Sequence, residues 1–167
     1  MRKTSFWKMF FWLMLLNVNV EASQTRQCLD KVPSSREICC LEERLTQLVN
    51  NERCKRGLIV LCSSKALAKT AKGHSKNMAD GRVAFGHGGF DKRAQPLMQK
   101  GCHIAFGENV AFCYLMQDPL KTAVDLWMRS PEHRKNILGD YNETGMGIAY
   151  NKDGRCFMTQ LFAKRLR

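Results

Sequence analysis

The sequence predicts an α+β domain built in layers. Apolar stripes with helical period come first, over residues 41–56 and about 64–80. A segment of alternating polarity with a central turn comes last, over residues 145–163. No strand–helix–strand alternation lies between them. Helices followed by a late hairpin are typical of layered α+β domains rather than of a parallel sheet.

Residues 1–22 have the pattern of a secretory signal peptide. A basic start with Arg2 and Lys3 precedes an apolar run over residues 9–16, and Ala22 follows as a small residue suited to cleavage. The run is shorter than the ~20 residues that a membrane span needs, so we expect cleavage and no transmembrane anchor. The mature chain is then expected to be secreted. Residues 23–40 are predicted to form a polar arm, residues 41–164 the domain and residues 165–167 a basic tail.

Two helices are expected next. Residues 41–56 carry Leu41, Leu45, Leu48 and Val49 on one face, and Gly57 ends the helix. Ser63 or Ser64 is expected to cap the second helix, which ends at Asp80 and Gly81. Its inner stripe contains Leu67, Ala68, Ala71, His74, Ser75 and Met78.

The second half of the chain alternates shorter elements. A glycine-rich loop at residues 86–89 precedes a short helix over residues 92–100, which Pro96 is expected to interrupt. Residues 104–113 are expected to form a buried strand. Pro119 begins a further helix that ends near Arg129, and a new helical turn starts at residues 130–131. Residues 145–150 and 155–163 are predicted to pair as a hairpin.

The chain is strongly basic, with 27 lysines and arginines against 15 acidic residues and a net charge of +12. Loss of the signal peptide would leave about +10. Such a charge favours acidic partners, including anionic lipid surfaces, glycans and acidic proteins. The basic residues are scattered, as at Arg53, Arg93 and Arg134, without interleaved aromatic residues. Nucleic-acid binding is therefore not expected.

Eight cysteines follow the signal segment, and an even count in an exported chain indicates disulfide bonds. The candidates are Cys28, Cys39, Cys40, Cys54, Cys62, Cys102, Cys113 and Cys156. The pairing is open, although Cys54–Cys62 and Cys102–Cys113 are attractive local pairs. Zinc binding by these thiols is not expected, because no Cys-x-x-Cys spacing occurs. Asn142, in Asn-Glu-Thr, is a candidate for glycosylation.

Three residues are candidates for a common site: His87, Glu108 and His133. His87 lies in the glycine-rich loop, and Glu108 interrupts an apolar strand, where a buried carboxylate needs a partner. Glu132 precedes His133 and points elsewhere on the helical turn, so His133 is the preferred partner. Gln160 is a secondary candidate. The set could be a structural network, a divalent-metal site with water in the open position, or a metal-free acid–base set.

Five ordered motifs resemble the CAP superfamily, which includes cysteine-rich secretory proteins, antigen 5 and plant pathogenesis-related proteins, and whose domain is called SCP. They are Phe-Gly-His at residues 85–87, Gly-Glu-Asn-Val at 107–110, Ala-Val-Asp-Leu-Trp-Met at 123–128, Ser-Pro-Glu-His-Arg-Lys-Asn-Ile-Leu at 130–138 and Thr-Gln at 159–160. Asn-Glu-Arg at residues 51–53 fits the same pattern. The resemblance covers residues 41 to about 164.

The resemblance implies an α–β–α sandwich with a small antiparallel sheet between helical layers. It also implies a cleft that holds two histidines and two glutamates in eukaryotic members. His87 and Glu108 match the first histidine and glutamate, whereas Ser130 and Phe157 stand where the second pair would fall. The motif at residues 130–138 is closest to the prokaryotic-type form, in which His133 takes the place of the second histidine.

Two functional hypotheses follow from the resemblance. The first is a secreted binding protein for a lipid or sterol, an anionic surface or a protein partner, with a His/Glu cleft that could hold a divalent metal such as zinc. The second is a metal-dependent secreted hydrolase, protease-like, that would use His87, Glu108 and His133. No serine or cysteine nucleophile stands beside a base in the sequence, so binding is favoured and no residue is assigned as catalytic.

Overall fold

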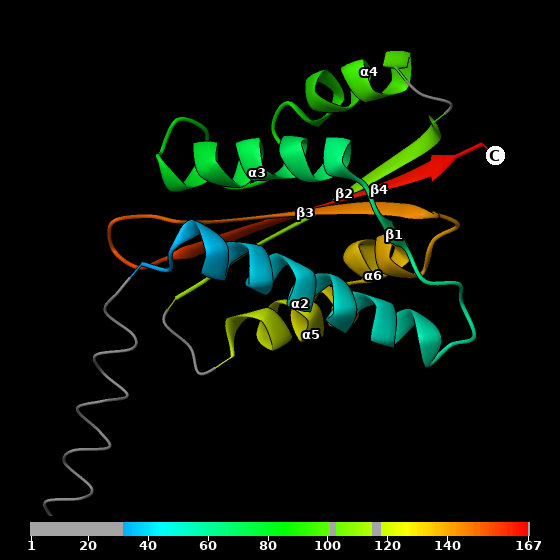
Figure 1. Cartoon of the computed structure of the whole chain (residues 1–167), viewed down its shortest axis with the longest axis horizontal. Helices are drawn as coiled ribbons and strands as arrows, with labels where there is room; N and C mark the ends of the chain where they lie inside the picture. The colour runs from blue at the N-terminus through cyan, green and yellow to red at the C-terminus, as the bar shows by residue number, and fades with distance from the viewer. Residues whose placement is uncertain (1–31, 101–102, 115–117, 167) are drawn as a thin grey trace, which may run out of the picture. The chain divides into compact units, whose positions relative to one another are not determined.

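A computed structural model describes residues 32–100, 103–114 and 118–166. Residues 33–167 form one unit, in which helices cover both faces of a four-stranded sheet (Figure 1). The strands are β1 (Cys62–Ser63), β2 (His103–Cys113), β3 (Glu143–Tyr150) and β4 (Cys156–Arg165). The helices are α2 (Ser35–Cys54), α3 (Lys65–Ala79), α4 (Phe90–Lys100), α5 (Pro119–Arg129) and α6 (Pro131–Leu138). The predicted signal peptide, Cys28 and Cys102 lie outside the described residues.

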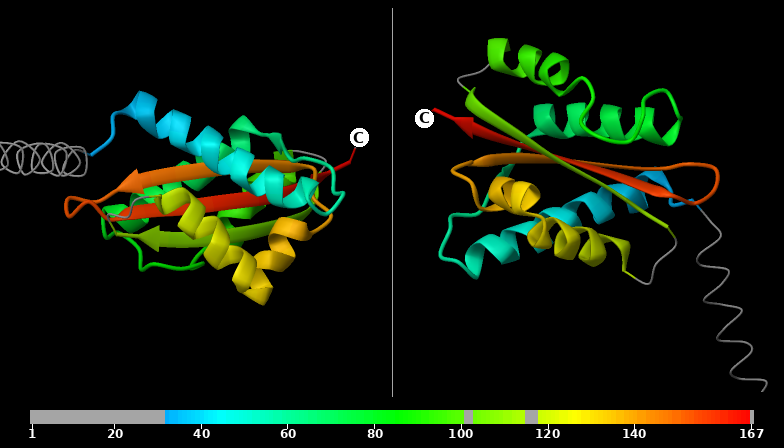
Figure 2. Two further views of the ribbon diagram at one scale, coloured as in Figure 1. Left: turned by 90° about the horizontal axis from the view of Figure 1, so that it is seen from below. Right: turned by 180° about the vertical axis from the view of Figure 1, so that it is seen from behind.

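The predicted layered fold is confirmed. Helix α3 covers one face of the sheet, and α2, α5 and α6 cover the other, as both views of Figure 2 show. The strand order is β1-β3-β4-β2, and β2, β4 and β3 pair antiparallel. The short β1, which the sequence did not reveal, pairs parallel with β3. The sheet is therefore mixed rather than purely antiparallel.

Helix α2 begins earlier than the predicted start at residue 41. Ser34 caps it, with its side chain accepting a hydrogen bond from the Glu37 backbone while the Glu37 carboxylate binds the Ser34 backbone. This reciprocal capping box satisfies two backbone donors at the helix start. The apolar stripe from residue 41 onward marks only the part of the helix that packs on the core, which explains the late prediction.

Arg53 ties the end of α2 to the end of α6. Its side chain is 3% exposed, although the sequence grouped it with scattered surface charges. The guanidinium donates hydrogen bonds to the carbonyls of Ile59, Ile137, Gly139 and Tyr141 at 2.7–3.2 Å. Arginine has five fixed donors, so one side chain can satisfy several of the carbonyls left free where a helix ends.

Two glycines of β3 allow α3 to lie directly on the sheet. A Cβ atom on Gly145 would stand 2.1 Å from the Ala68 backbone nitrogen. A Cβ atom on Gly147 would stand 2.2 Å from the Lys72 backbone nitrogen. Only glycine permits this approach. The predicted inner stripe of α3 is buried except for Ala68, which is half-buried, and Ser75 donates a hydrogen bond of 2.8 Å to the Gly147 carbonyl.

Strand β2 is an edge strand whose outward carbonyls are covered by side chains. Tyr141 donates to the Phe106 carbonyl at 3.2 Å, Asn136 to the Glu108 carbonyl at 3.1 Å, and Trp127 to the Val110 carbonyl at 3.0 Å. An exposed edge would invite pairing with another chain, and covering its acceptors prevents this. The same bonds fix α5 and α6 against β2.

The remaining helices follow the predictions with one difference. Helix α4 runs through Pro96 rather than being interrupted by it, and α5 begins at Pro119 with Asp118 as its cap. Trp127 is 1% exposed in the core between the sheet and helices α2, α5 and α6, as expected. None of the helices in the described part of the chain combines the length and hydrophobicity of a membrane span.

Candidate functional site

Glu108 lies on β2 and is the buried charge around which the site is built. Its carboxylate accepts two hydrogen bonds from the Arg93 guanidinium, at 2.9 and 2.8 Å, and one oxygen also lies 3.1 Å from His87 Nδ1. The Glu108 side chain is 2% exposed and that of Arg93 is 18% exposed. A buried carboxylate is stable only with such partners. The histidine in contact with Glu108 is therefore His87 rather than the preferred His133, and Arg93 makes more of the bonds.

The loop that carries His87 is fixed at both ends. The His74 Nε2 atom lies 2.9 Å from the Gly86 carbonyl, and Arg93 donates a hydrogen bond of 2.6 Å to the Gly88 carbonyl. Gly86 and Gly89 have φ angles of 135° and 75°, which favour glycine. The His87 side chain is half exposed, whereas His74 is buried as the sequence predicted. Burial lowers the pKa of His74, so its ring is neutral near pH 7.

His133 lies on α6 and approaches His87 at the edge of the sheet. Its ring centroid lies 6.0 Å from that of His87, and its backbone carbonyl accepts a hydrogen bond of 3.1 Å from Asn109. Burial lowers the pKa of His133, and the charge of a protonated His87 lowers this pKa further. Near neutral pH the site therefore presents a neutral His133 ring beside the solvent-exposed His87.

The secondary candidates lie elsewhere. Glu132 is exposed on α6, and Gln160 pairs in register with Asn109, on the face of the sheet opposite Glu108. The Gln160 amide donates a hydrogen bond of 3.1 Å to the Thr144 hydroxyl, so Gln160 links strand β4 to strand β3 inside the domain. Asn142 exchanges two 2.8 Å hydrogen bonds with the Arg165 backbone. Its glycosylation stays a prediction.

Comparison with known proteins decides the family. Residues 46–162 match the model of the CAP family, described as the cysteine-rich secretory protein family. This chain belongs to the CAP family. It is also 33% identical over 135 residues to the uncharacterized protein YkwD of Bacillus subtilis (strain 168), an alignment that covers 79% of this chain and 50% of YkwD. A match to the uncharacterized membrane protein YlbC of the same organism covers 34% of that protein, again at 33% identity. The chain thus spans half of YkwD and about a third of YlbC.

Solved CAP-fold structures confirm the architecture. An outer surface protein from Borrelia burgdorferi is similar with a TM-score of 0.65 at 21% identity, over 81% of this chain and 98% of that one. An extracellular protein containing an SCP domain from Bacillus anthracis str. Ames is similar with a TM-score of 0.60 at 25% identity. That alignment covers 81% of this chain and 45% of the Bacillus anthracis chain. These neighbours are outer-surface and extracellular proteins.

The side chains of this CAP domain do not fit a zinc site in their present arrangement. Both oxygens of Glu108 accept hydrogen bonds from Arg93, and the guanidinium charge beside them would repel a metal cation. Across the described ranges, no three His, Cys, Asp or Glu side chains group as metal ligands would. His87, Glu108 and Arg93 form a hydrogen-bonded network, with His133 facing it.

Sequence reasoning missed Arg93, although a signal for it exists. Helix α4 starts at Phe90, and Ala94 and Leu97 lie on its inner side. Positions three and four residues apart share one helical face, so Arg93 falls on the inner stripe with Phe90 and Leu97. An arginine on the inner face of a helix needs buried acceptors, which for Arg93 are the oxygens of Glu108.

The cysteines within the described residues carry free thiols. Cys39, Cys40, Cys54 and Cys62 are exposed, and Cys113 and Cys156 are buried. The candidate Cys54–Cys62 bond is not formed. Cys102, of the candidate Cys102–Cys113 pair, lies outside the described residues, and β2 separates its chain neighbour His103 from Cys113 by about 33 Å.

Proposed function

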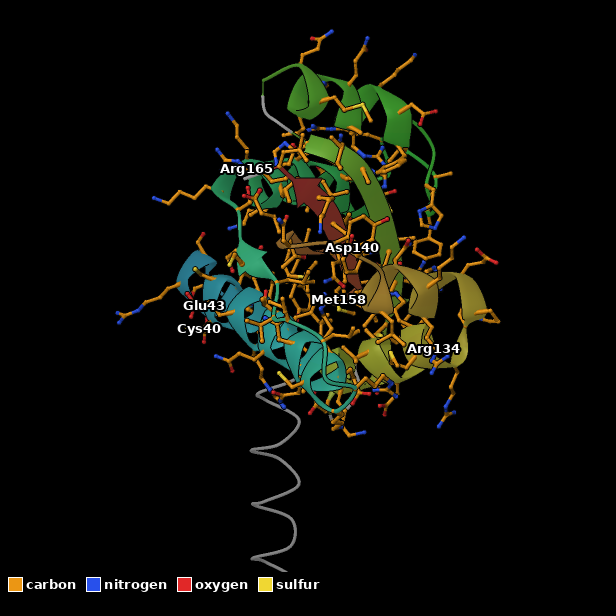
Figure 3. All side chains as sticks on the ribbon, turned by 90° about the vertical axis from the view of Figure 1, so that its right-hand side faces the viewer. Cys40, Glu43, Arg134, Asp140, Met158 and Arg165 are labelled. Carbon is orange, nitrogen blue, oxygen red and sulfur yellow. The ribbon has the colours of Figure 1, made fainter. Side chains whose placement is uncertain are left out.

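We propose that this CAP domain is exported and acts by binding anionic lipid. The observation that carries the proposal is a pocket of about 510 Å³ at the end of the domain where β4 finishes. It lies between the α2–β1 loop, the segment after α6 and the last residues of β4. Figure 3 views the domain from this end and labels Asp140 and Arg165, which both line the pocket.

The pocket combines exposed apolar side chains with positive charge. Ile59 is 76% exposed and Leu166 is 53% exposed, and both line it. Lys164 and Arg165 line the same pocket, together with the acidic Asp140. Apolar side chains that enter the acyl region and basic groups that meet headgroups are the two features that peripheral lipid binding uses.

The charge of the whole chain supports the same ligand class. The net charge is +12 over the whole chain and about +10 without the signal peptide. It attracts anionic surfaces over several ångströms, and each basic residue near such a surface contributes about 1 kcal/mol. Export is supported by the signal-peptide pattern over residues 1–22 and by the extracellular and outer-surface neighbours.

Vesicle sedimentation tests the proposal. The full mature chain is expected to sediment with phosphatidylglycerol vesicles and not with phosphatidylcholine vesicles, and raised salt should release it because charge attraction is screened. The variant Ile59→Ser/Leu166→Ser should lose at least about tenfold in affinity, since two apolar groups worth about 1.5–3 kcal/mol each no longer leave water.

A matched control keeps this test specific. Met98 and Ile104 are 49% and 60% exposed and do not line the pocket, so Met98→Ser/Ile104→Ser removes similar apolar groups elsewhere. If both double variants bind equally, or if the wild type ignores anionic vesicles, the lipid proposal fails and a protein partner becomes the better candidate.

The metal-dependent hydrolase remains the alternative function. It would require Arg93 to release Glu108 before His87, Glu108 and His133 could act together. An assay of protein substrates with and without chelator, on wild type and His87→Ala, separates the two functions. Turnover that both the chelator and His87→Ala abolish would favour the hydrolase.

A further inference from the structure

Two buried cysteines face each other at the end of the β2–β4 ladder. Cys113 is the last residue of β2, Cys156 is the first of β4, and the two are register partners. Their exposed fractions are 4% and 2%, and both belong to the core cluster between the sheet and helices α2, α5 and α6. β2 and β4 lie side by side in both views of Figure 2.

This placement suits a covalent link. Directly opposed residues of an antiparallel pair point to the same face, with Cα atoms about 4.5–5.5 Å apart. Disulfide bonds span Cα separations of about 4.4–6.8 Å. We propose that Cys113 and Cys156 form a cross-strand disulfide bond under oxidising conditions, and that the thiols described above are its reduced state.

Of the other cysteines that the structure describes, none competes for this pairing. Among the described residues, Cys39, Cys40 and Cys54 lie on α2, outside the ladders, and the register partner of Cys62 is Glu143. Cys102 adjoins His103, whose register partner is Arg165 at the opposite end of the ladder from Cys156. The register therefore gives each of Cys113 and Cys156 one cysteine neighbour.

The surroundings determine when the bond forms. Burial raises the pKa of Cys156 to about 11 and also raises the pKa of Cys113, so few thiolates exist once the sheet is closed. Oxidation is expected during folding, by exchange with a small disulfide such as glutathione disulfide. One cysteine thiolate attacks that disulfide and releases a first glutathione thiolate. The second cysteine thiolate then attacks the mixed disulfide and releases the other, and the two cysteine protons end on the two glutathiones.

The link would fasten the part of the chain that carries His133, which faces the His/Glu network. The loop that it closes, residues 114–155, contains α5, α6 and His133. Cross-linking a long loop limits the unfolded chain more than the folded one. The bond would also hold the edge strand β2, and with it Glu108, against β4.

Peptide mapping tests the pairing without any variant. The full chain, refolded in a glutathione redox buffer, is alkylated and digested with trypsin, which yields residues 101–121 and 156–164. These peptides are expected as one linked species that separates after reduction. Chymotrypsin cuts after Phe112 and so distinguishes a link through Cys113 from one through Cys102. Alkylated Cys113 and Cys156, or a link from either to another cysteine, would overturn the proposal.

Thermal unfolding gives an independent readout. Reduction of the oxidised wild type should lower its midpoint by about 10 °C. The Cys113→Ala/Cys156→Ala variant should show no such shift, whereas Cys54→Ala/Cys62→Ala should keep it. An equal shift in both double variants would show that another pair is responsible. Neither readout depends on lipid binding, so the two proposals can fail separately.

Discussion

Arg93 and Glu108 form an ion pair in which one guanidinium nitrogen, Nη2, lies within 2.9 Å of both carboxylate oxygens. The pair joins α4 to the edge strand β2, and the same arginine holds the loop of His87 through the Gly88 carbonyl. One side chain thus neutralises the buried charge and positions the exposed histidine. The network has a structural role whatever ligand the domain binds.

Removal of the arginine should therefore destabilise the domain strongly. Arg93→Met keeps most of the side-chain volume but leaves Glu108 buried with His87 as its remaining partner. We expect a loss of about 3–5 kcal/mol in the free energy of unfolding, because the carboxylate loses most of its compensation. Urea unfolding followed by circular dichroism measures this loss.

A double-mutant cycle provides the control for this prediction. Glu108→Gln removes the buried charge, so Arg93→Met in that background should cost much less than in the wild type. Additive costs would mean that Arg93 stabilises through packing alone, and the ion-pair interpretation would then be wrong.

The fold was predictable because its elements follow local rules. The inner stripe of α3, the proline start of α5 and the turn of the β3–β4 hairpin each depend on a few neighbouring residues. Arg53 and Arg93 were not predictable in the same way. Their partners are the end of α6 and Glu108, which are distant in sequence, so a sequence stripe shows at most that each faces inward.

The site shows the same limit. His87, Glu108 and His133 were grouped from their motifs, and the structure brings them to one edge of the sheet. Whether Glu108 serves a metal or an arginine depends on α4, which packs on β2 only in the folded chain. Gln160 was placed with the site by its motif, but strand alternation turns it to the opposite face.

Acidification should destabilise the domain before the carboxylates titrate. The pKa values of His74 and His133 lie below 6.5 in the folded chain, mainly because of burial. Below about pH 6.5 the unfolded chain then binds more protons than the folded chain. The free energy of unfolding therefore keeps its full value above that pH and falls as the pH drops. The lowered pKa values of Glu52 and Glu143 start from 4.5, so their contribution is lost at lower pH.

Urea unfolding at pH 7.5, 6.5, 5.5 and 5.0 measures this dependence. His133→Gln cannot protonate and should flatten the decline between pH 6.5 and 5.0, even if its stability at pH 7.5 also changes. A variant with the full wild-type decline would assign the pH dependence to His74 or to other groups.

Close packing of α3 on β3 makes opposite predictions for two glycines. Gly147→Ala places a methyl group 2.2 Å from the Lys72 backbone nitrogen, so the helix must shift. We expect a loss of roughly 3 kcal/mol or more in the free energy of unfolding. Gly73 lies on the exposed face of α3, and a Cβ atom there meets nothing within 4 Å. Gly73→Ala should therefore stabilise the helix by up to about 1 kcal/mol. Thermal unfolding of both variants decides the matter, since a tolerated Gly147→Ala would mean that α3 and β3 are not in direct backbone contact.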